Sequence, residues 1–309
     1  MDGLDTVIAV LAGAIRAGTP LALAALGELV TERSGVLNLG VEGTMLVGAV
    51  TGFIATVITG SPHVGVLAAC LAGVAMSLVF AVLTQFLLTN QVATGLALTI
   101  FGIGLSAFVG LGYIGTPIDG LRPVPVPVLA DIPVLGPLLF RHDLLIYLSI
   151  VLFAAIAWFL HRTRSGLVLR AVGESHDAAH AIGYSVVRVR ILAIVFGGAM
   201  SGLAGAYLSL VYTPQWAENM TAGRGWIAVA LVVFATWRPF PVMAGAWLFG
   251  GITILSLHIQ AIGFGVSSHL VATLPYLATV LVLALISRDA MRIRLNAPAC
   301  LGKPFHPAA

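Results

Sequence analysis

The sequence predicts an all-α protein that crosses a membrane several times and forms a single transmembrane domain over residues 1–309. Hydrophobic residues make up 59% of the chain and charged residues only 9%, and the mean hydropathy is +1.05. Soluble domains carry about 25% charged residues, so a soluble core does not account for this composition. Apolar runs of about 20 residues, the length that crosses a hydrocarbon core of ~30 Å, recur along the chain.

Nine apolar runs are long enough to form membrane helices. They lie at residues 6–27, 39–60, 64–88, 92–114, 143–161, 191–213, 217–237, 239–258 and 269–287. Residues 115–142 interrupt them with a polar, proline-rich stretch, which we expect to form an extended external loop. Runs one to four and six to nine are compatible with two inverted four-helix repeats joined by run five.

The distribution of basic residues predicts the orientation of the chain. With the N-terminus outside, most arginines and the single lysine fall on the cytoplasmic side, as the positive-inside rule requires. These residues are Arg33, Arg162, Arg164, Arg170, Arg188, Arg190, Arg238, Arg288, Arg292, Arg294 and Lys303. The other side or the membrane receives Arg16, Arg122, Arg141 and Arg224. The polar loop 162–190 and the tail 288–309 are therefore expected in the cytoplasm.

Two segments interrupt the apolar helices with glycines and charged residues. Residues 27–43 contain three acids, an arginine and an asparagine, and residues 218–226 place Gly-Arg-Gly before a short apolar stretch. Irregular backbone at membrane depth persists only where protein or a water-filled cavity satisfies it, and paired interruptions point to a transport site. The residues that we expect to line a substrate pathway are Asn38, Glu42, Arg224 and Trp226.

The polar residues among these also have simpler interpretations. An arginine at mid-membrane costs about 2.5–3.5 kcal/mol on insertion scales, whereas water solvates Arg224 and the acids at little cost if they lie at an interface. Asn38 can bond a sugar hydroxyl or a base edge, but it can equally cap the helix that follows. Trp226 can stack on a nucleobase or sugar face.

The longest polar interval of the chain, residues 162–190, contains a predicted short helix. Ser175 can cap its N-terminus, Asp177 lies in the first turn near the positive end of the helix dipole, and Gly183 supplies a left-handed stop. The predicted small apolar face consists of Ala178, Ala179 and Ile182. Such a helix at the membrane surface suits the docking of another protein, and an ordinary positive-inside loop is the simpler alternative.

Three separated motifs resemble those of a known family. The interval carries RTRSG at 162–166 and LRAVGE at 169–174, the first interruption reads ERSGVLNLGVEG at 32–43, and the second reads MTAGRGWIA at 220–228. In this order they resemble permease subunits of bacterial ABC importers. The resemblance is closest to the nucleoside/simple-sugar permeases, which are related to the ribose and branched-chain amino-acid permeases, and it extends from about Leu21 to Leu285.

The resemblance implies a transport subunit with the fold of ribose-type permeases in the bacterial cytoplasmic membrane. It also implies a second permease subunit in a heterodimer, a cytoplasmic ATPase subunit, and a substrate-binding protein or lipoprotein outside. The expected substrate is a nucleoside. Loop 162–190 corresponds to the loop that contacts the ATPase, and its expected coupling residues are Arg170, Gly173, Glu174, Asp177, Ala178, Ala179 and Gly183.

Other kinds of site are disfavoured. A nucleotide-binding P-loop needs a lysine followed by Ser or Thr, but Lys303 is followed by proline, so we expect ATP and Mg²⁺ in the partner ATPase and no cofactor in this chain. His176 and His180 have metal-ligand spacing without an evident third ligand, and Cys70 and Cys300 are far apart, so no metal site is expected. The net charge of +3 comes mainly from arginines beside the spans and does not indicate nucleic-acid binding.

Alternative functions remain at this point. The substrate of such a permease can also be a simple sugar or a branched-chain amino acid. An ion-coupled secondary transporter would need acids buried in mid-span, whereas the acids here cluster at the ends of the predicted spans. An intramembrane enzyme would need a catalytic pair, and no Ser/His/Asp or Cys/His set stands out in one segment.

Overall fold

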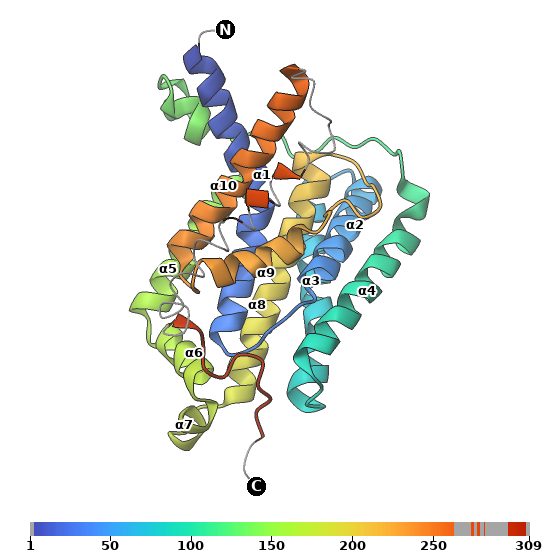
Figure 1. The fold of residues 1–309 in the computed structure, drawn as a ribbon. Helices are drawn as coiled ribbons and strands as arrows, with labels where there is room; N and C mark the ends of the chain where they lie inside the picture. Colours follow the sequence, from blue (N-terminus) through green and yellow to red (C-terminus); the bar gives the residue numbers. More distant parts are fainter. Residues whose placement is uncertain (1–2, 263–272, 275–276, 279–280, 282–295, 307–309) are drawn as a thin grey trace.

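The computed structural model describes residues 3–262, 273–274, 277–278, 281 and 296–306, and these residues form helices joined by loops, with no strand among them (Figure 1). The α-helices are α1 (Gly3–Arg33), α2 (Val41–Thr59), α3 (Pro62–Ala81), α4 (Gln91–Gly110), α5 (Leu144–Arg162), α6 (Arg164–Glu174), α7 (His176–Ala181), α8 (Val186–Tyr207), α9 (Arg224–Phe234) and α10 (Pro239–Ile262). Shorter helical turns are η1 (Val82–Phe86), η2 (Leu111–Tyr113), η3 (Leu129–Asp131), η4 (Gly136–Phe140) and η5 (Leu208–Tyr212).

In the part of the chain that the structure describes, seven helical stretches are long and apolar enough to cross a membrane. They are Thr6–Arg33, Val41–Thr59, Pro62–Phe86, Gln91–Tyr113, Leu144–Arg162, Val186–Tyr212 and Pro239–Gln260. The all-α, multi-pass class and seven of the nine predicted runs are thereby confirmed. The ninth run, 269–287, lies largely outside the described residues, so the pair of inverted repeats stays a prediction.

The prediction of a membrane-length helix at 217–237 is wrong. The helical part of this run is α9, which has 11 residues and is about 16 Å long at 1.5 Å per residue, shorter than a ~30 Å hydrocarbon core. Left-handed backbone at Asn219 (φ 57°), Ala222 (φ 49°) and Gly223 (φ 82°) keeps the helix from beginning earlier. The interruption that the glycines predicted at 218–226 is present, and the structure places it at 213–223, before α9.

Residues 213–237 nevertheless connect opposite ends of the bundle. At one end the carbonyl of Leu210 accepts a hydrogen bond from the backbone N–H of Leu121, in the loop 115–142 (2.9 Å). At the other end, where α6 and α7 lie, the carbonyl of Trp237 accepts bonds from Nε (3.0 Å) and Nη2 (2.8 Å) of Arg33. The segment therefore runs from the loop end to the α6–α7 end.

The tail lies at the α6–α7 end, as the distribution of basic residues predicted. The backbone N–H of Cys300 donates to the carbonyl of Gly173, the second-last residue of α6 (2.9 Å). Figure 1 shows the tail, in dark red, passing beside α6 at the end of the molecule away from the N-terminus. The polar loop and the tail thus share one end.

Helix α8 packs against α1, α2 and α3 in the centre of the bundle, and α10 lies along α1 (Figure 1). Small residues allow this packing, as they do between membrane helices in general. A Cβ atom at Gly73 would lie 2.1 Å from the carbonyl oxygen of Gly198, and one at Gly48 would lie 2.7 Å from Cα of Gly202. The backbones of α3 and α2 therefore touch that of α8 directly.

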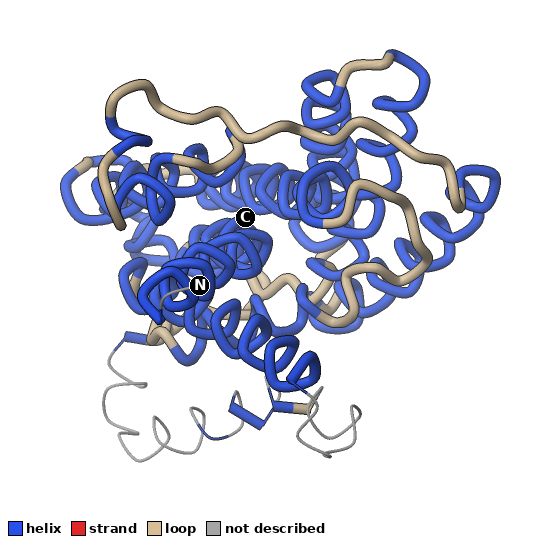
Figure 2. Tube along the Cα trace, turned by 90° about the horizontal axis from the view of Figure 1, so that it is seen from above, coloured by secondary structure: helices blue, strands red, loops and turns tan. Residues whose placement is uncertain are grey.

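The proline-rich stretch 115–142 contains only the short turns η3 and η4, which agrees with the predicted non-membrane loop. Its two halves pair where Val124 N–H donates to the carbonyl of His142 (2.9 Å) and Val126 N–H donates to that of Phe140 (3.0 Å). Figure 2, which looks down on the N-terminal end, shows long loops running across this end of the bundle.

Candidate pathway junction and coupling surface

The two interrupted segments meet at Glu42, in the first turn of α2. Its side chain is buried (3% exposed). Oε1 accepts hydrogen bonds from Thr221 Oγ1 (2.5 Å) and from the N–H of Gly223 (2.8 Å), and Oε2 accepts one from the N–H of Gly225 (2.6 Å). One carboxyl group thus satisfies three donors and ties the turn before α9 to the start of α2. We call Glu42, Thr221, Gly223 and Gly225 the junction.

The two glycines of the junction are needed for different physical reasons. Gly223 precedes α9 in a left-handed conformation (φ 82°), which favours glycine. A Cβ atom at Gly225 would lie 2.5 Å from Cα and 2.7 Å from Oε2 of Glu42. Any larger residue at position 225 would therefore push the carboxyl group away from its donors.

The segment between α1 and α2 is also held by side chains. The N–H of Asn38 donates to Glu28 Oε1 (3.2 Å), and the N–H of Leu37 donates to Gln91 Oε1 (2.9 Å). Asn38 itself is buried (5% exposed), and its Oδ1 accepts a bond from the N–H of Gly40 (2.8 Å). Asn38 therefore closes the turn that leads into α2. This role resembles helix capping, the simpler interpretation of Asn38, more than it resembles contact with substrate.

Arg224 and Trp226 differ from Asn38 and Glu42 because they keep exposed surface. Arg224 is partly exposed, and its Nη1 donates to the carbonyls of Met220 (3.1 Å) and Thr221 (3.3 Å). Its guanidinium also lies 5.8 Å from the centroid of the Tyr212 ring. Within the described residues Arg224 makes no ion pair with an acid. Trp226 is 37% exposed.

A third acid, Glu32, holds the turn that follows α9. Glu32, near the end of α1, is fully buried, and its Oε2 accepts a hydrogen bond from Trp237 Nε1. Sequence reasoning missed this pair and also missed Thr221, because no local pattern indicates which residue a buried carboxyl group will meet. The only signal was the cost of burying Glu32 without a partner.

The predicted short helix of the polar loop is present as α7. Ser175 caps it by accepting a bond from the N–H of Ala178 (3.3 Å). Gly183 has the predicted left-handed backbone (φ 95°), and its N–H donates to the carbonyl of His180 (2.9 Å) while that of Tyr184 donates to Ala179 (3.1 Å). Both predicted ends of the helix are thereby confirmed.

The prediction that Ala178, Ala179 and Ile182 form one exposed apolar face is wrong for Ala179. Ala179 is buried (2% exposed) because it packs against Val172, Val186 and Phe305 of the same chain. Ala178 is exposed, and Ile182 is 72% exposed. We define the coupling surface as the exposed residues Leu167, Glu174, Asp177, Ala178, Ile182 and Tyr184.

The other predicted coupling residues lie behind this surface. A Cβ atom at Gly173 would lie 2.2 Å from the carbonyl oxygen of Arg33, so α6 approaches the end of α1 at this glycine. Arg170 is half-buried, and its Nε has no partner among the described residues. His176 lies beside Arg190, and burial together with that positive charge lowers the pKa of its imidazole.

No group of three His, Cys, Asp or Glu side chains in the described residues is arranged to hold a metal ion.

Comparison with known proteins identifies the family. Residues 10–286 match the family described as "Branched-chain amino acid transport system / permease component". The chain belongs to this permease family. It is a transport subunit rather than an enzyme, and ABC permeases of this kind work with ATPase and binding-protein partners. No solved structure matches the permease.

Three relatives align with the permease over nearly their whole length. The putative glucose ABC transporter permease protein TsgC13 of Haloferax volcanii is 40% identical, over 94% of this chain and 95% of its own. The guanosine ABC transporter permease protein NupQ of Bacillus subtilis is 29% identical, over 99% and 98%. The nucleoside ABC transporter permease protein NupC of Lactococcus lactis is 29% identical, over 92% and 94%.

The geometry of the permease separates two kinds of site residue. At the junction, buried side chains hold the backbone of two interrupted segments, and Arg224 and Trp226 project from the held segment with exposed surface. At the α6–α7 end, inward-facing residues hold two short helices whose exposed side chains include apolar residues, the acids Glu174 and Asp177, and the basic Arg164. The first arrangement suits recognition of a small polar molecule, and the second suits contact with a protein.

Proposed function

We propose that the permease carries nucleosides across the bacterial cytoplasmic membrane as one half of an ATP-driven importer, paired with a second, different permease. A nucleoside substrate is supported by the relatives named as guanosine and nucleoside permeases, which align over 99% and 92% of this chain. A simple sugar is the second candidate, because the relative named as a putative glucose permease is 40% identical.

The observation that carries the proposal is the junction. Arg224 and Trp226 both belong to the segment that Glu42 holds, and both keep exposed surface. An indole face can stack on a nucleobase or a sugar, and a guanidinium can donate to a base carbonyl or a hydroxyl. In this proposal Arg224 and Trp226 line the pathway, and the buried Asn38 and Glu42 keep the two segments in place beside it.

The coupling surface is proposed to receive the ATPase subunit, which binds ATP and Mg²⁺. Its apolar side chains provide contact area, and Glu174 and Asp177 add negative charge. The position of this surface is set by Arg170, Gly173 and Ala179, which lie beneath it, and by Gly183, which ends α7. In this orientation the α6–α7 end is cytoplasmic, the N-terminus is outside, and a binding protein or lipoprotein delivers substrate to the loop end.

Uptake into proteoliposomes tests the proposal. The vesicles would contain both permeases and the ATPase, with the binding protein on the loop side and ATP on the α6–α7 side. Uptake of radiolabelled guanosine is expected only with hydrolysable ATP. Trp226→Ala should lower it, whereas Trp158→Ala, which truncates an exposed tryptophan on α5, should leave it unchanged.

Three outcomes would contradict parts of the proposal. Uptake of glucose but not guanosine would transfer the substrate assignment to the second candidate. Uptake that follows an ion gradient without ATP would refute an ATP-driven importer. Unchanged uptake in Trp226→Ala would remove Trp226 from the pathway.

A further inference from the structure

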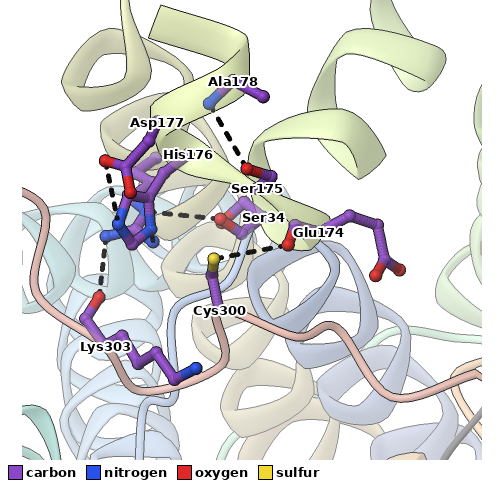
Figure 3. Close-up of polar contacts among 9 residues, drawn as sticks. Ser34, Glu174, Ser175, His176, Asp177, Ala178, Cys300 and Lys303 are labelled. Carbon is purple, nitrogen blue, oxygen red and sulfur yellow. Dashed lines mark hydrogen bonds and ion pairs between the residues drawn. The ribbon is translucent and has the colours of Figure 1, made fainter.

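Residues 296–306 fold back onto the α6–α7 end and bridge two parts of the permease. The N–H of Cys300 donates to the carbonyl of Gly173 in α6 (2.9 Å), and the N–H of Gly302 donates to the carbonyl of Gly35, just after α1 (3.1 Å). Figure 3 shows Cys300 and Lys303 on this segment, facing Ser34, Glu174 and His176. We call residues 296–306 the strap.

A fully buried arginine from α8 joins the strap to its surroundings. Arg190 is 0% exposed. Its Nη1 donates to the carbonyl of Lys303 in the strap (3.0 Å), and its Nε donates to the carbonyl of Ser34 (3.3 Å). Its Nη2 lies 3.4 Å from Nδ1 of His176 in α7, which can accept when the imidazole is neutral. One guanidinium therefore contacts the strap, the end of α1 and α7 at once.

The strap also supplies the hydrophobic support for α7. Phe305 is 5% exposed and packs in the cluster that contains Ala179. The centroid of its ring lies 5.3 Å from those of both His176 and His180, edge to face. Helix α7 has six residues, far fewer than the roughly 12–15 that an isolated helix needs in water, so its position depends on such packing.

We propose that the strap positions α7 against the turn after α1, so that a displacement of α7 by the ATPase reaches the segment that leads to Glu42. The contacts run from α7 through Phe305 and Arg190 to Ser34, four residues before Asn38. Phe305 and Arg190 are then positioning residues. This inference rests on the proposed ATPase contact of α7.

The native cysteines provide a direct test in the assembled transporter. Cys300 is 8% exposed in the strapped arrangement, and Cys70→Ser removes the other thiol. In that background Phe305→Ala should increase the rate of Cys300 labelling by a maleimide by roughly 150- to 4,000-fold, the shift expected from loss of a buried phenyl ring. Transport per ATP hydrolysed should fall, while the ATPase still co-purifies. Phe305→Tyr should keep the native labelling rate of Cys300 and the native transport per ATP. His306→Ala, which changes an exposed neighbour, should alter neither quantity.

Ile182→Asp separates failure of the strap from failure of the ATPase contact. This variant changes the coupling surface and leaves the strap intact, so it should weaken co-purification of the ATPase with Cys300 still protected. If Ile182→Asp keeps a normal, coupled ATPase, the proposed contact itself is wrong. If Ile182→Asp has its effect but Phe305→Ala leaves Cys300 protected or coupling normal, the strap proposal alone is overturned. Phe305→Leu replaces Phe305→Ala, with the same readouts, if the alanine variant does not assemble.

Discussion

Replacing Glu42 with glutamine tests whether one carboxyl group holds the interrupted segments together. The amide keeps the size of the side chain, but only its oxygen accepts hydrogen bonds, and its nitrogen donates. In the native junction both carboxyl oxygens accept, from Thr221 and Gly223 on one side and from Gly225 on the other. At least one donor of the turn therefore loses its acceptor and faces an NH₂ group instead.

The size of the effect follows from that unmet donor. Leaving a buried donor unsatisfied costs about 1–3 kcal/mol. If the turn before α9 opens locally, this cost corresponds to about a 5- to 150-fold increase in the open population. The helices that cross the membrane keep their own hydrogen bonds, so assembly should persist while transport falls.

Hydrogen exchange measures this change at the atoms concerned. The amides of Gly223 and Gly225 should exchange faster in Glu42→Gln by that factor, and uptake should decrease in the same variant. Glu218→Gln is the matched control, because Glu218 is an exposed acid of the same segment. Unchanged exchange at both glycines, with normal uptake, would refute the role assigned to Glu42.

Further predictions concern the pathway, pH and topology. Arg224→Ala should reduce uptake without preventing assembly, because among the described residues the guanidinium donates hydrogen bonds only to nearby carbonyls, and it is partly exposed; normal uptake would make it an interfacial anchor. Burial and Arg190 lower the pKa of His176, so its support of α7 is complete above its ordinary pKa of about 6.5 and is lost as the pH falls through the lowered value. ATP-coupled uptake should therefore decline as the pH falls below the ordinary histidine pKa of about 6.5, and less steeply in His176→Gln. Cysteines placed at Val128 and Asp177, both exposed, should react with an impermeant maleimide from opposite sides of the membrane.

The sequence predicted those features that depend on local composition. Apolar runs of membrane length predicted the spans, and the glycines and charges of 218–226 predicted an interruption there. The exact limits of the interruption escaped prediction because Asn219 and Ala222 adopt left-handed backbone that neither residue type demands. It is held by the bonds of the turn to Glu42, which lies 181 residues away from Gly223.

The coupling surface illustrates the same limit. Ser175 and Gly183 act on their own helix, so their roles were readable from the order of residues. Whether Ala179 points inward depends on Phe305, which approaches from the far end of the chain. A pattern confined to residues 162–190 contains no information about that contact.

The glycine contacts of α8 determine which parts of the permease can move independently. Where Gly73 meets Gly198 and Gly48 meets Gly202, backbone touches backbone and no side chain lies between that could rotate to absorb a shift. Helices α2, α3 and α8 therefore translate together or separate outright. Helix α5 meets α10 through the edge-to-face rings of Phe153 and Phe240, which can slide past each other. We therefore expect the interface between α5 and α10 to yield more easily than the glycine contacts of α8 when the bundle is displaced.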